Sequence, residues 1–258
     1  MVSHEDDEPN TMAEMTISLQ QEMNKLEVLA LVPARGGSKS MPRKNLREVA
    51  GRPMVAHSIE HALQAKFVTR VILTTDDEEI ADAGRRAGAE VPFMRPAEFA
   101  QDLSTDYEFV RHALEWLRDN EGYVPDMVLQ LRPTTPIRDV RLIDRAIIAL
   151  AAHPEADSLR AVVLACFTPY KMWLLGEDGF MKPLMTLAGF EEPHNQPRQL
   201  LPDVYQQDGF LDIVRPRTIF EQNSITGANI LPFFLKQESI DIDYENELIE
   251  ADRIMRGQ

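Results

Sequence analysis

Short apolar segments alternate with segments of helical periodicity along most of this 258-residue chain. Strand-like runs occupy residues 26–32, 70–74, 90–94, 126–131, 158–165, 209–214 and 225–231, and helical patterns occupy about 53–64, 77–86, 105–118, 139–151 and 245–255. A strand that is followed by a helix must cross over before it meets the next strand, which favours parallel pairing with helices on both faces. We therefore expect an α/β fold, a mostly parallel sheet with flanking helices.

Two regions fall outside this alternation. Residues 166–208 are punctuated by prolines at 169, 183, 193, 197 and 202 and leave only short strand-like pieces, which indicates an inserted lobe. Residues 1–24 are polar, acidic and rich in Met, and we predict a flexible acidic tail. The remaining chain, 25–258, is predicted to form one domain that starts near Leu26.

Charge and composition exclude several partners. The chain holds 27 Lys and Arg against 42 Asp and Glu, a net charge of −15, and such a field repels nucleic acid and anionic membranes. No apolar run approaches the roughly 20 residues of a membrane span, and the first residues are acidic where a secretory signal is basic, so we expect a cytoplasmic protein. The single Cys166 lies in an apolar run and is predicted to be a packed thiol.

A cationic loop, residues 34–47, reverses this negative charge locally. It carries Arg35, Lys39, Arg43, Lys44 and Arg47 with no acidic residue, and it follows the first strand. Gly36 and Gly37 allow backbone conformations that aim several N–H groups at one point, and a helix start follows, so the loop is suited to a polyphosphate. A solvated basic turn is the alternative. The spacing matches neither the Walker pattern nor the dinucleotide-binding fingerprint.

The cationic loop also carries a family resemblance. Residues 31–45 resemble the signature of the acylneuraminate cytidylyltransferases, the CMP-sialic acid synthetase family. The resemblance continues at 95–98 and Asp102, at 132–138, at 196–202 and at 239–243, and it covers nearly everything after residue 26. It implies a nucleotide-diphospho-sugar transferase fold, Rossmann-like, and a homodimer in which the inserted lobe reaches the partner's active site.

The resemblance further implies a reaction in which CTP activates a nonulosonic acid, a nine-carbon 2-keto sugar acid, to a CMP-sugar and pyrophosphate. It assigns nucleotide binding to Ala34, Arg35, Gly36, Ser38, Lys39, Lys44, Arg95 and Thr105, with Arg35, Lys44 and Asn45 as catalytic residues. It assigns acceptor binding to Arg132, Thr134, Gln196, Arg198, Gln199, Tyr205 and Asp208. From sequence alone, Arg198 is equally suited to a carboxylate ligand and to backbone carbonyls of its own loop.

Two aspartates near the carboxyl terminus are candidate metal ligands. Asp241 and Asp243 are two residues apart, and on a strand they would face the same side and could hold one Mg²⁺ ion. Such an ion neutralises charge in phosphate chemistry. Capping of the helix that follows is the alternative for this pair. The general base of the reaction stays open.

Two departures from the family pattern leave the substrates open. Arg132 stands where the sialic acid enzymes have Gln, and Asp208 stands where they have Asn. Together with residues 170–173 these resemble a subgroup that handles legionaminic-type acids, or enzymes that act on an amino-sugar phosphate. The alternatives are therefore transfer to a sugar 1-phosphate, with GTP as a further nucleotide, and a nucleotide-binding module without catalysis.

A further pattern matches zinc peptidases. His57, Glu60 and His61 fit H-x-x-E-H on a predicted helix. The buried stripe of that helix is predicted at Val55, Ile59, Ala62 and Leu63, and both histidines lie off it. We expect solvated histidines without zinc.

Overall fold

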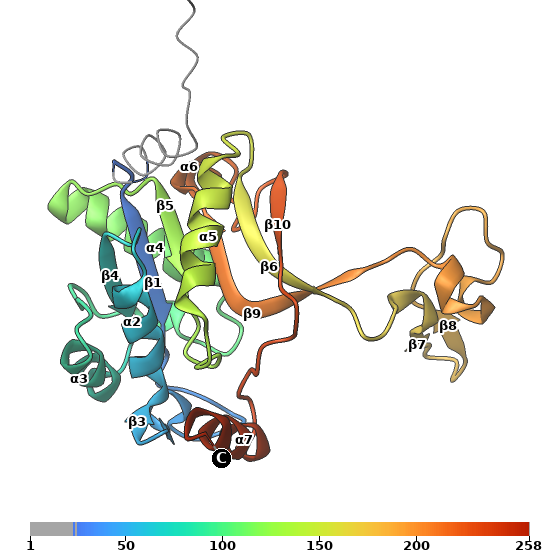
Figure 1. Ribbon diagram of the computed structural model, residues 1–258, viewed down its shortest axis with the longest axis horizontal. Helices are drawn as coiled ribbons and strands as arrows, with labels where there is room; N and C mark the ends of the chain where they lie inside the picture. Colours follow the sequence, from blue (N-terminus) through green and yellow to red (C-terminus); the bar gives the residue numbers. More distant parts are fainter. Residues whose placement is uncertain (1–22, 24, 258) are drawn as a thin grey trace, which may run out of the picture.

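A six-stranded sheet forms the centre of the computed structural model, which describes residue 23 and residues 25–257 (Figure 1). Its strand order is β10 (Ile230–Phe234), β6 (Ser158–Leu164), β9 (Tyr205–Val214), β5 (Met127–Gln130), β1 (Val28–Pro33) and β4 (Arg70–Thr74). Only β9 runs antiparallel to its two neighbours, β5 and β6. The mostly parallel sheet is confirmed.

Helices cover both faces because the strand side chains alternate. Val28 and Val32 of β1 pack with α2 (Met54–Gln64), α3 (Glu78–Arg86) and α5 (Val140–Ala151), whereas Leu29 and Leu31 pack with α4 (Asp106–Glu121) and α6 (Pro216–Glu221). The last helix, α7 (Glu245–Met255), belongs to a separate apolar cluster that includes Met41 from the cationic loop. The carboxyl-terminal segment is therefore held beside that loop.

Local capping fixes where the helices begin. Asp77 accepts the N–H groups of Glu79 and Ile80 at the start of α3, and Asp139 accepts that of Arg141 at the start of α5. Thr105 and Glu108 form a capping box on α4. Gly88 follows α3 with φ +99°, a left-handed conformation that suits glycine.

The inserted lobe lies between β6 and β9 and projects away from the sheet (Figure 1). It contains the short antiparallel pair β7 (Trp173–Leu175) and β8 (Met181–Pro183) and three single turns of 3₁₀ helix, η3 (Pro169–Lys171), η4 (Pro193–Asn195) and η5 (Arg198–Leu200). Strand β9 begins at Tyr205, inside the range of about 166–208 predicted for the lobe.

Several local predictions were wrong. Residues 90–94 form no strand: Glu90 makes one bridge to Ile72, and Pro92 then lacks the N–H that would extend the ladder. Two elements were missed, the helix α6 and a small hairpin of β2 (Glu48–Val49) and β3 (Arg52–Pro53), and β10 starts at residue 230 rather than 225.

Side-chain burial also departs from prediction at several positions. Cys166 is exposed rather than packed, and Leu63 is 51% exposed at the edge of α2. Met23 is buried in the main core, so the fold begins before Leu26. The rest of the predicted acidic tail, 1–22 and 24, lies outside the described residues. None of the described helices is long and apolar enough to cross a membrane.

Candidate active site

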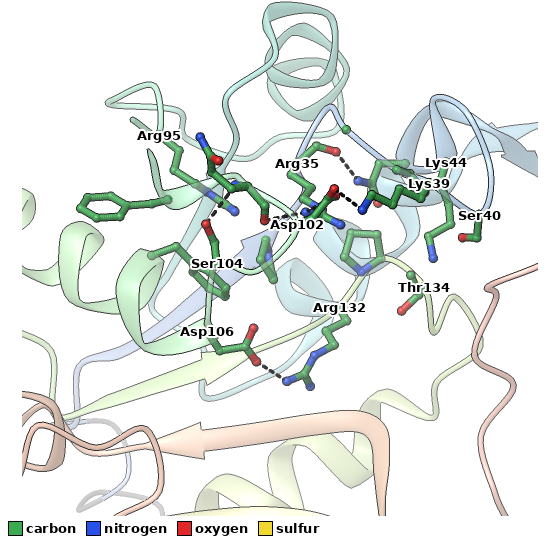
Figure 2. Close-up of a pocket in the computed structure, with 18 of the residues that line it drawn as sticks. Arg35, Lys39, Ser40, Lys44, Arg95, Asp102, Ser104, Asp106, Arg132 and Thr134 are labelled. Atoms are coloured by element: carbon green, nitrogen blue, oxygen red, sulfur yellow. Dashed lines mark hydrogen bonds and ion pairs between the residues drawn. The ribbon is translucent and has the colours of Figure 1, made fainter. Parts of the chain in front are cut away.

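A cavity of about 420 Å³ opens where β1 and β5 end (Figure 2). The chain passes from β1 to β4 on one side of it and then from β4 to β5 on the other side of β1, and open α/β sheets bind ligands where the strand order reverses in this way. The cavity lies between the cationic loop, the segment 99–109 and the end of β5. Its lining comprises Pro33, Arg35, Gly37, Ser38, Lys39, Ser40, Lys44, Asn45, Arg95, Phe99, Gln101, Asp102, Ser104, Asp106, Phe109, Gln130, Arg132, Pro133, Thr134 and Asp243.

Three cations of the loop face this cavity. Arg35 and Lys39 both contact Asp102, with N···O distances of 3.3 and 2.7 Å, and Lys44 Nζ lies 2.7 Å from Asp243. The other two cations point elsewhere: Arg43 pairs with Asp77 and Glu79, and Arg47 pairs with Glu245. The cavity therefore concentrates positive charge in a protein that is strongly acidic.

The loop is held in shape by contacts behind it. Ala34 N–H donates to the carbonyl of Thr74, and buried Asn45 donates from Nδ2 to the carbonyl of Arg35 at 2.9 Å. Asn45 thus lines the cavity and braces the loop at once. Ala34 itself is buried and does not line the cavity.

Gly36 contacts the two aspartates that follow β4. Its N–H donates to Asp76 Oδ1 at 2.9 Å instead of facing the cavity, and its φ is not in the left-handed region. A Cβ at this position would lie 2.8 Å from Asp77 Oδ2, so glycine is needed for close approach. The two adjacent aspartates have different tasks, since Asp77 caps α3 and Asp76 holds the loop.

Arg95 lines the cavity, whereas Thr105 begins helix α4 between the lining residues Ser104 and Asp106. The guanidinium of Arg95 is buried, donates to the carbonyl of Thr74 at 2.6 Å and lies 4.6 Å from the ring centre of Phe109. Burial lowers the pKa of Arg95 to about 10, so it stays protonated at neutral pH. Thr105 does not line the cavity: its hydroxyl contacts Glu108 in the capping box. Contact between Thr105 and the base of the nucleotide stays a prediction.

Arg132 is fixed on the opposite wall. Its guanidinium donates to Asp106 at 2.6 Å and to Asp212 at 2.8 Å (Figure 2 draws the first contact). Gln130 donates to the same Asp106 oxygen at 2.9 Å. Neither Asp106 nor Gln130 was predicted as a site residue. One signal was present, since Gln130 is a polar residue inside an apolar strand.

The predicted acceptor residues are not brought together within one chain. Thr134 lines the cavity with Arg132, but Gln196, Arg198, Gln199 and Tyr205 belong to the lobe or its base and do not line it. Arg198 donates to the carbonyls of Ala165 and Cys166. Within one chain this side chain therefore binds backbone carbonyls, which is one of the two alternatives given by the sequence.

Asp208 holds backbone rather than lining the cavity. It is buried, and its two oxygens accept the N–H groups of Phe210 and Ser239, each at 2.8 Å. This carboxylate ties the segment before Asp241 to β9. These two hydrogen bonds help to position that segment.

The two candidate metal ligands lie in an extended, non-strand segment. Ile242 between them is fully buried in the α7 cluster, and its N–H donates to the carbonyl of Thr134 at 2.7 Å. Asp243 lines the cavity at Lys44, and Asp241 lies beside Gly209. Helix α7 is capped by Tyr244 and Glu247, so neither Asp241 nor Asp243 caps it.

Carboxylate oxygens are the donors that Mg²⁺ prefers, so this pair fits the ion in chemistry. Among the described residues no cluster of three or more His, Cys, Asp or Glu side chains could hold a metal ion. A bound ion would therefore need oxygens from elsewhere, such as a triphosphate.

The predicted solvation of the histidine pair on α2 is wrong. His57 is buried, and its Nε2 lies 2.8 Å from the carbonyl of Val49 in the β2–β3 hairpin. His61 is half-buried, and its Nδ1 is shielded from solvent without a hydrogen-bond partner. Burial first, and then the charge of Arg138, lowers the pKa of His61 to about 4.

This shift predicts an acid-sensitive stability. His61 has a lower pKa when folded than when unfolded, so its contribution is intact above about pH 6.5 and is lost as the pH falls toward 4. We expect His61→Gln to remove about 2–3 kcal/mol of that acid destabilisation. Urea unfolding at pH 8, 6 and 4.5 measures it. An unchanged pH slope in the variant would contradict the assignment.

Comparisons with known proteins address the family. The profile of a family described as "Cytidylyltransferase" matches residues 29–206, more than half of the chain. The chain belongs to this cytidylyltransferase family. The matched region contains the cationic loop, Arg95 and Arg132 and ends before Asp241.

Individual relatives agree with the family. This cytidylyltransferase is 29% identical over 238 residues to CMP-N,N'-diacetyllegionaminic acid synthase of Legionella pneumophila, covering 89% of the chain and 97% of that protein. It is 36% identical over 221 residues to N-acylneuraminate cytidylyltransferase of Escherichia coli, which covers 84% of the chain and 49% of that longer protein.

The fold also has a solved counterpart. CMP:2-keto-3-deoxy-manno-octonic acid synthetase, solved in complex with CTP, matches with a TM-score of 0.67 at 16% identity over 90% of this chain and 99% of that one. The predicted nucleotidyltransferase fold, enzyme class and family resemblance are confirmed.

Proposed function

We propose that this enzyme transfers CMP from CTP to a nonulosonic acid and releases pyrophosphate. The observation that carries the proposal is the cavity at the ends of β1 and β5, where Arg35, Lys39 and Lys44 face one space. The names of the relatives support the nucleotide and the acceptor class. A CTP-consuming enzyme draws on the cellular nucleotide pool, and we propose the cytoplasm as its location.

In the proposed reaction the anomeric hydroxyl of the acid attacks the α-phosphorus of CTP. An oxygen–phosphorus bond forms to the sugar, the bond to pyrophosphate breaks, and the hydroxyl proton leaves to a base or solvent. The three cations hold the triphosphate and stabilise the negative charge that builds up on departing pyrophosphate. Asn45 donates a hydrogen bond to the Arg35 carbonyl and so keeps the loop in position. Arg95 offers hydrogen-bond donors to the pyrimidine base of CTP.

Mg²⁺ is proposed as the cofactor, held by Asp241 and Asp243 beside the triphosphate. When bound, it would neutralise phosphate charge and help align the α-phosphate with the acceptor. The residues that hold this segment in place are Asp208, through Ser239, and Thr134, through Ile242. Lys44 pairs with Asp243 and keeps that carboxylate at the cavity.

We further propose a homodimer in which the lobe of one chain reaches the cavity of its partner. The lobe is apolar on its surface: Phe167, Leu175, Phe180 and Met181 are each more than 60% exposed. Several exposed apolar side chains on one projecting lobe are typical of a protein interface. Pairing would bring Gln196, Arg198 and Gln199 to the acceptor side of a cavity that one chain leaves open.

The dimer proposal predicts a defined mass. We expect a particle of about twice the 29.3 kDa chain mass by sedimentation, and monomers after Leu175→Glu with Phe180→Glu. The monomer should keep nucleotide binding and lose turnover, because the acceptor side stays incomplete. Val124→Glu introduces the same charge at an exposed apolar residue outside the lobe and should change neither property. A fully active monomer would contradict the proposal.

A pyrophosphate-release assay tests the function. CTP, GTP, UTP and ATP are each paired, with Mg²⁺, with neuraminic, legionaminic and pseudaminic acids and with glucosamine 1-phosphate. Release with CTP and a nonulosonic acid supports the proposal and names the acceptor. Release only with the sugar phosphate or with GTP would replace it by sugar 1-phosphate activation. Nucleotide binding without release from any pair would favour a non-catalytic module.

A further inference from the structure

The carboxylate of Asp102 forms ion pairs with two of the cations that the proposed function assigns to the triphosphate. Asp102 contacts Lys39 at 2.7 Å and Arg35 at 3.3 Å (Figure 2). The carbonyl of the neighbouring Gln101 accepts a hydrogen bond from Arg35 at 2.6 Å. Both acceptors come from a segment more than 60 residues away in sequence. Among the described residues, Asp102 is the only acidic side chain that pairs with both Arg35 and Lys39.

The segment that carries Asp102, residues 97–104, is built as a strap between two fixed ends. Before it, the N–H of Arg95 donates to the carbonyl of Thr75 at 2.7 Å. After it, Thr105 begins α4 with a capping box. Within it, Ser104 Oγ donates to the Glu98 carbonyl and accepts the Gln101 N–H, so the strap is a compact turn with its own hydrogen bonds.

The contact between strap and loop is of a kind that breaks easily. The side chain of Lys39 is 80% exposed and that of Asp102 is 44% exposed, and solvent and salt weaken ion pairs at such positions. Lys39 holds the pKa of Asp102 below its usual value, so the carboxylate is ionised at neutral pH. A triphosphate offers several charged oxygens to the same two cations, whereas Asp102 offers one carboxylate.

We propose that Asp102 is an intramolecular competitor of the triphosphate: it occupies Arg35 and Lys39 in the free enzyme, and nucleotide binding displaces it and releases the strap. The inference rests on the proposed function, since it needs a triphosphate at these cations. After pyrophosphate departs, Asp102 returns to the same two side chains. The residue thereby limits affinity for both the substrate triphosphate and the product pyrophosphate.

The test is binding of inorganic tripolyphosphate, pyrophosphate and CTP by calorimetry to the full chain. We expect Asp102→Asn to bind each probe about 3–10-fold more tightly, because the competing carboxylate is gone. Glu98→Gln removes the same charge from the same strap at a residue that does not line the cavity, and it should change the affinities by less than about twofold. Circular dichroism confirms that each variant is folded.

A double-mutant cycle separates competition from simple charge repulsion. In a Lys39→Gln background the gain from Asp102→Asn should fall to less than half, because one of the two contested cations is absent. An equal gain in both backgrounds, or weaker binding by Asp102→Asn, would overturn the inference. If the wild-type enzyme binds neither tripolyphosphate nor CTP, the proposed function fails at its phosphate site. If the wild-type enzyme binds them and Asp102→Asn leaves the affinities unchanged, only the inference about Asp102 is overturned.

Discussion

Replacing Lys44 with alanine is expected to lower kcat/KM by about 10²–10³-fold while the protein stays folded. The Nζ of Lys44 faces the cavity, its side chain is only 13% exposed, and it is one of three loop cations available to a triphosphate. A partly desolvated cation interacts strongly with charge that develops during phosphoryl transfer. The loss should appear mainly in kcat. Steady-state kinetics with CTP measures it.

Arg47 supplies the matched control for this prediction. It lies in the same loop with the same charge, but it pairs with Glu245 and does not line the cavity. We expect Arg47→Ala to change kcat/KM by less than about threefold, since exposed pairs contribute little. Equal effects of the two substitutions would show that the loop acts through its net charge alone and that Lys44 has no special position at the phosphates.

The second large effect is expected at the two aspartates. Asp241→Asn and Asp243→Asn should each reduce the rate by about 10–100-fold and move the Mg²⁺ dependence to higher concentration, because each variant removes one charged oxygen ligand. Titration of the rate with Mg²⁺ at saturating CTP measures both. The fold should persist, since the backbone of this segment is held by Ile242 and Asp208.

A control for the aspartates is Asp82 on α3. It is exposed, pairs with Arg85 and lies outside the cavity lining, so Asp82→Asn should leave the Mg²⁺ curve unchanged. If Asp241→Asn and Asp243→Asn also leave it unchanged, they are not the metal ligands. A lower thermal stability with an unaltered Mg²⁺ curve would give them a structural role only.

The alternation of strands and helices could be predicted because it rests on local signals. Helix α7 matches its predicted range, and Asp77, Asp139 and Thr105 stand at helix starts as capping chemistry requires. Apolar runs in parallel strands are recognisable for the same reason, since both faces are buried.

The errors come from contacts between distant segments. His57 lies off the predicted apolar stripe, yet the β2–β3 hairpin covers that side of α2 and brings the carbonyl of Val49 to the imidazole. Glu90 pairs with β4 for one residue only, because Pro92 cannot continue the ladder. Helical periodicity and β-propensity carry no information on which neighbour covers a face.

The site was predictable where it follows one loop and not where it needs several segments. Arg35, Lys39 and Lys44 stand out as a basic cluster in an acidic chain, and the structure places all three at the cavity. Asp102, Asp106 and Gln130 line the same cavity only because the fold brings their segments to it. The lobe residues Gln196 and Arg198 stay outside the cavity of their own chain, so their predicted role depends on a second copy.

The central claim is nucleotidyl transfer from CTP, and the fate of its phosphates tests it most directly. The enzyme is incubated with Mg²⁺, a nonulosonic acid and CTP labelled with ³²P at either the α or the γ position. We expect the α label in a CMP-sugar and the γ label in pyrophosphate. A γ label that appears on the sugar, or an α label that stays in CTP or free CMP with the acid unchanged, would contradict the claim.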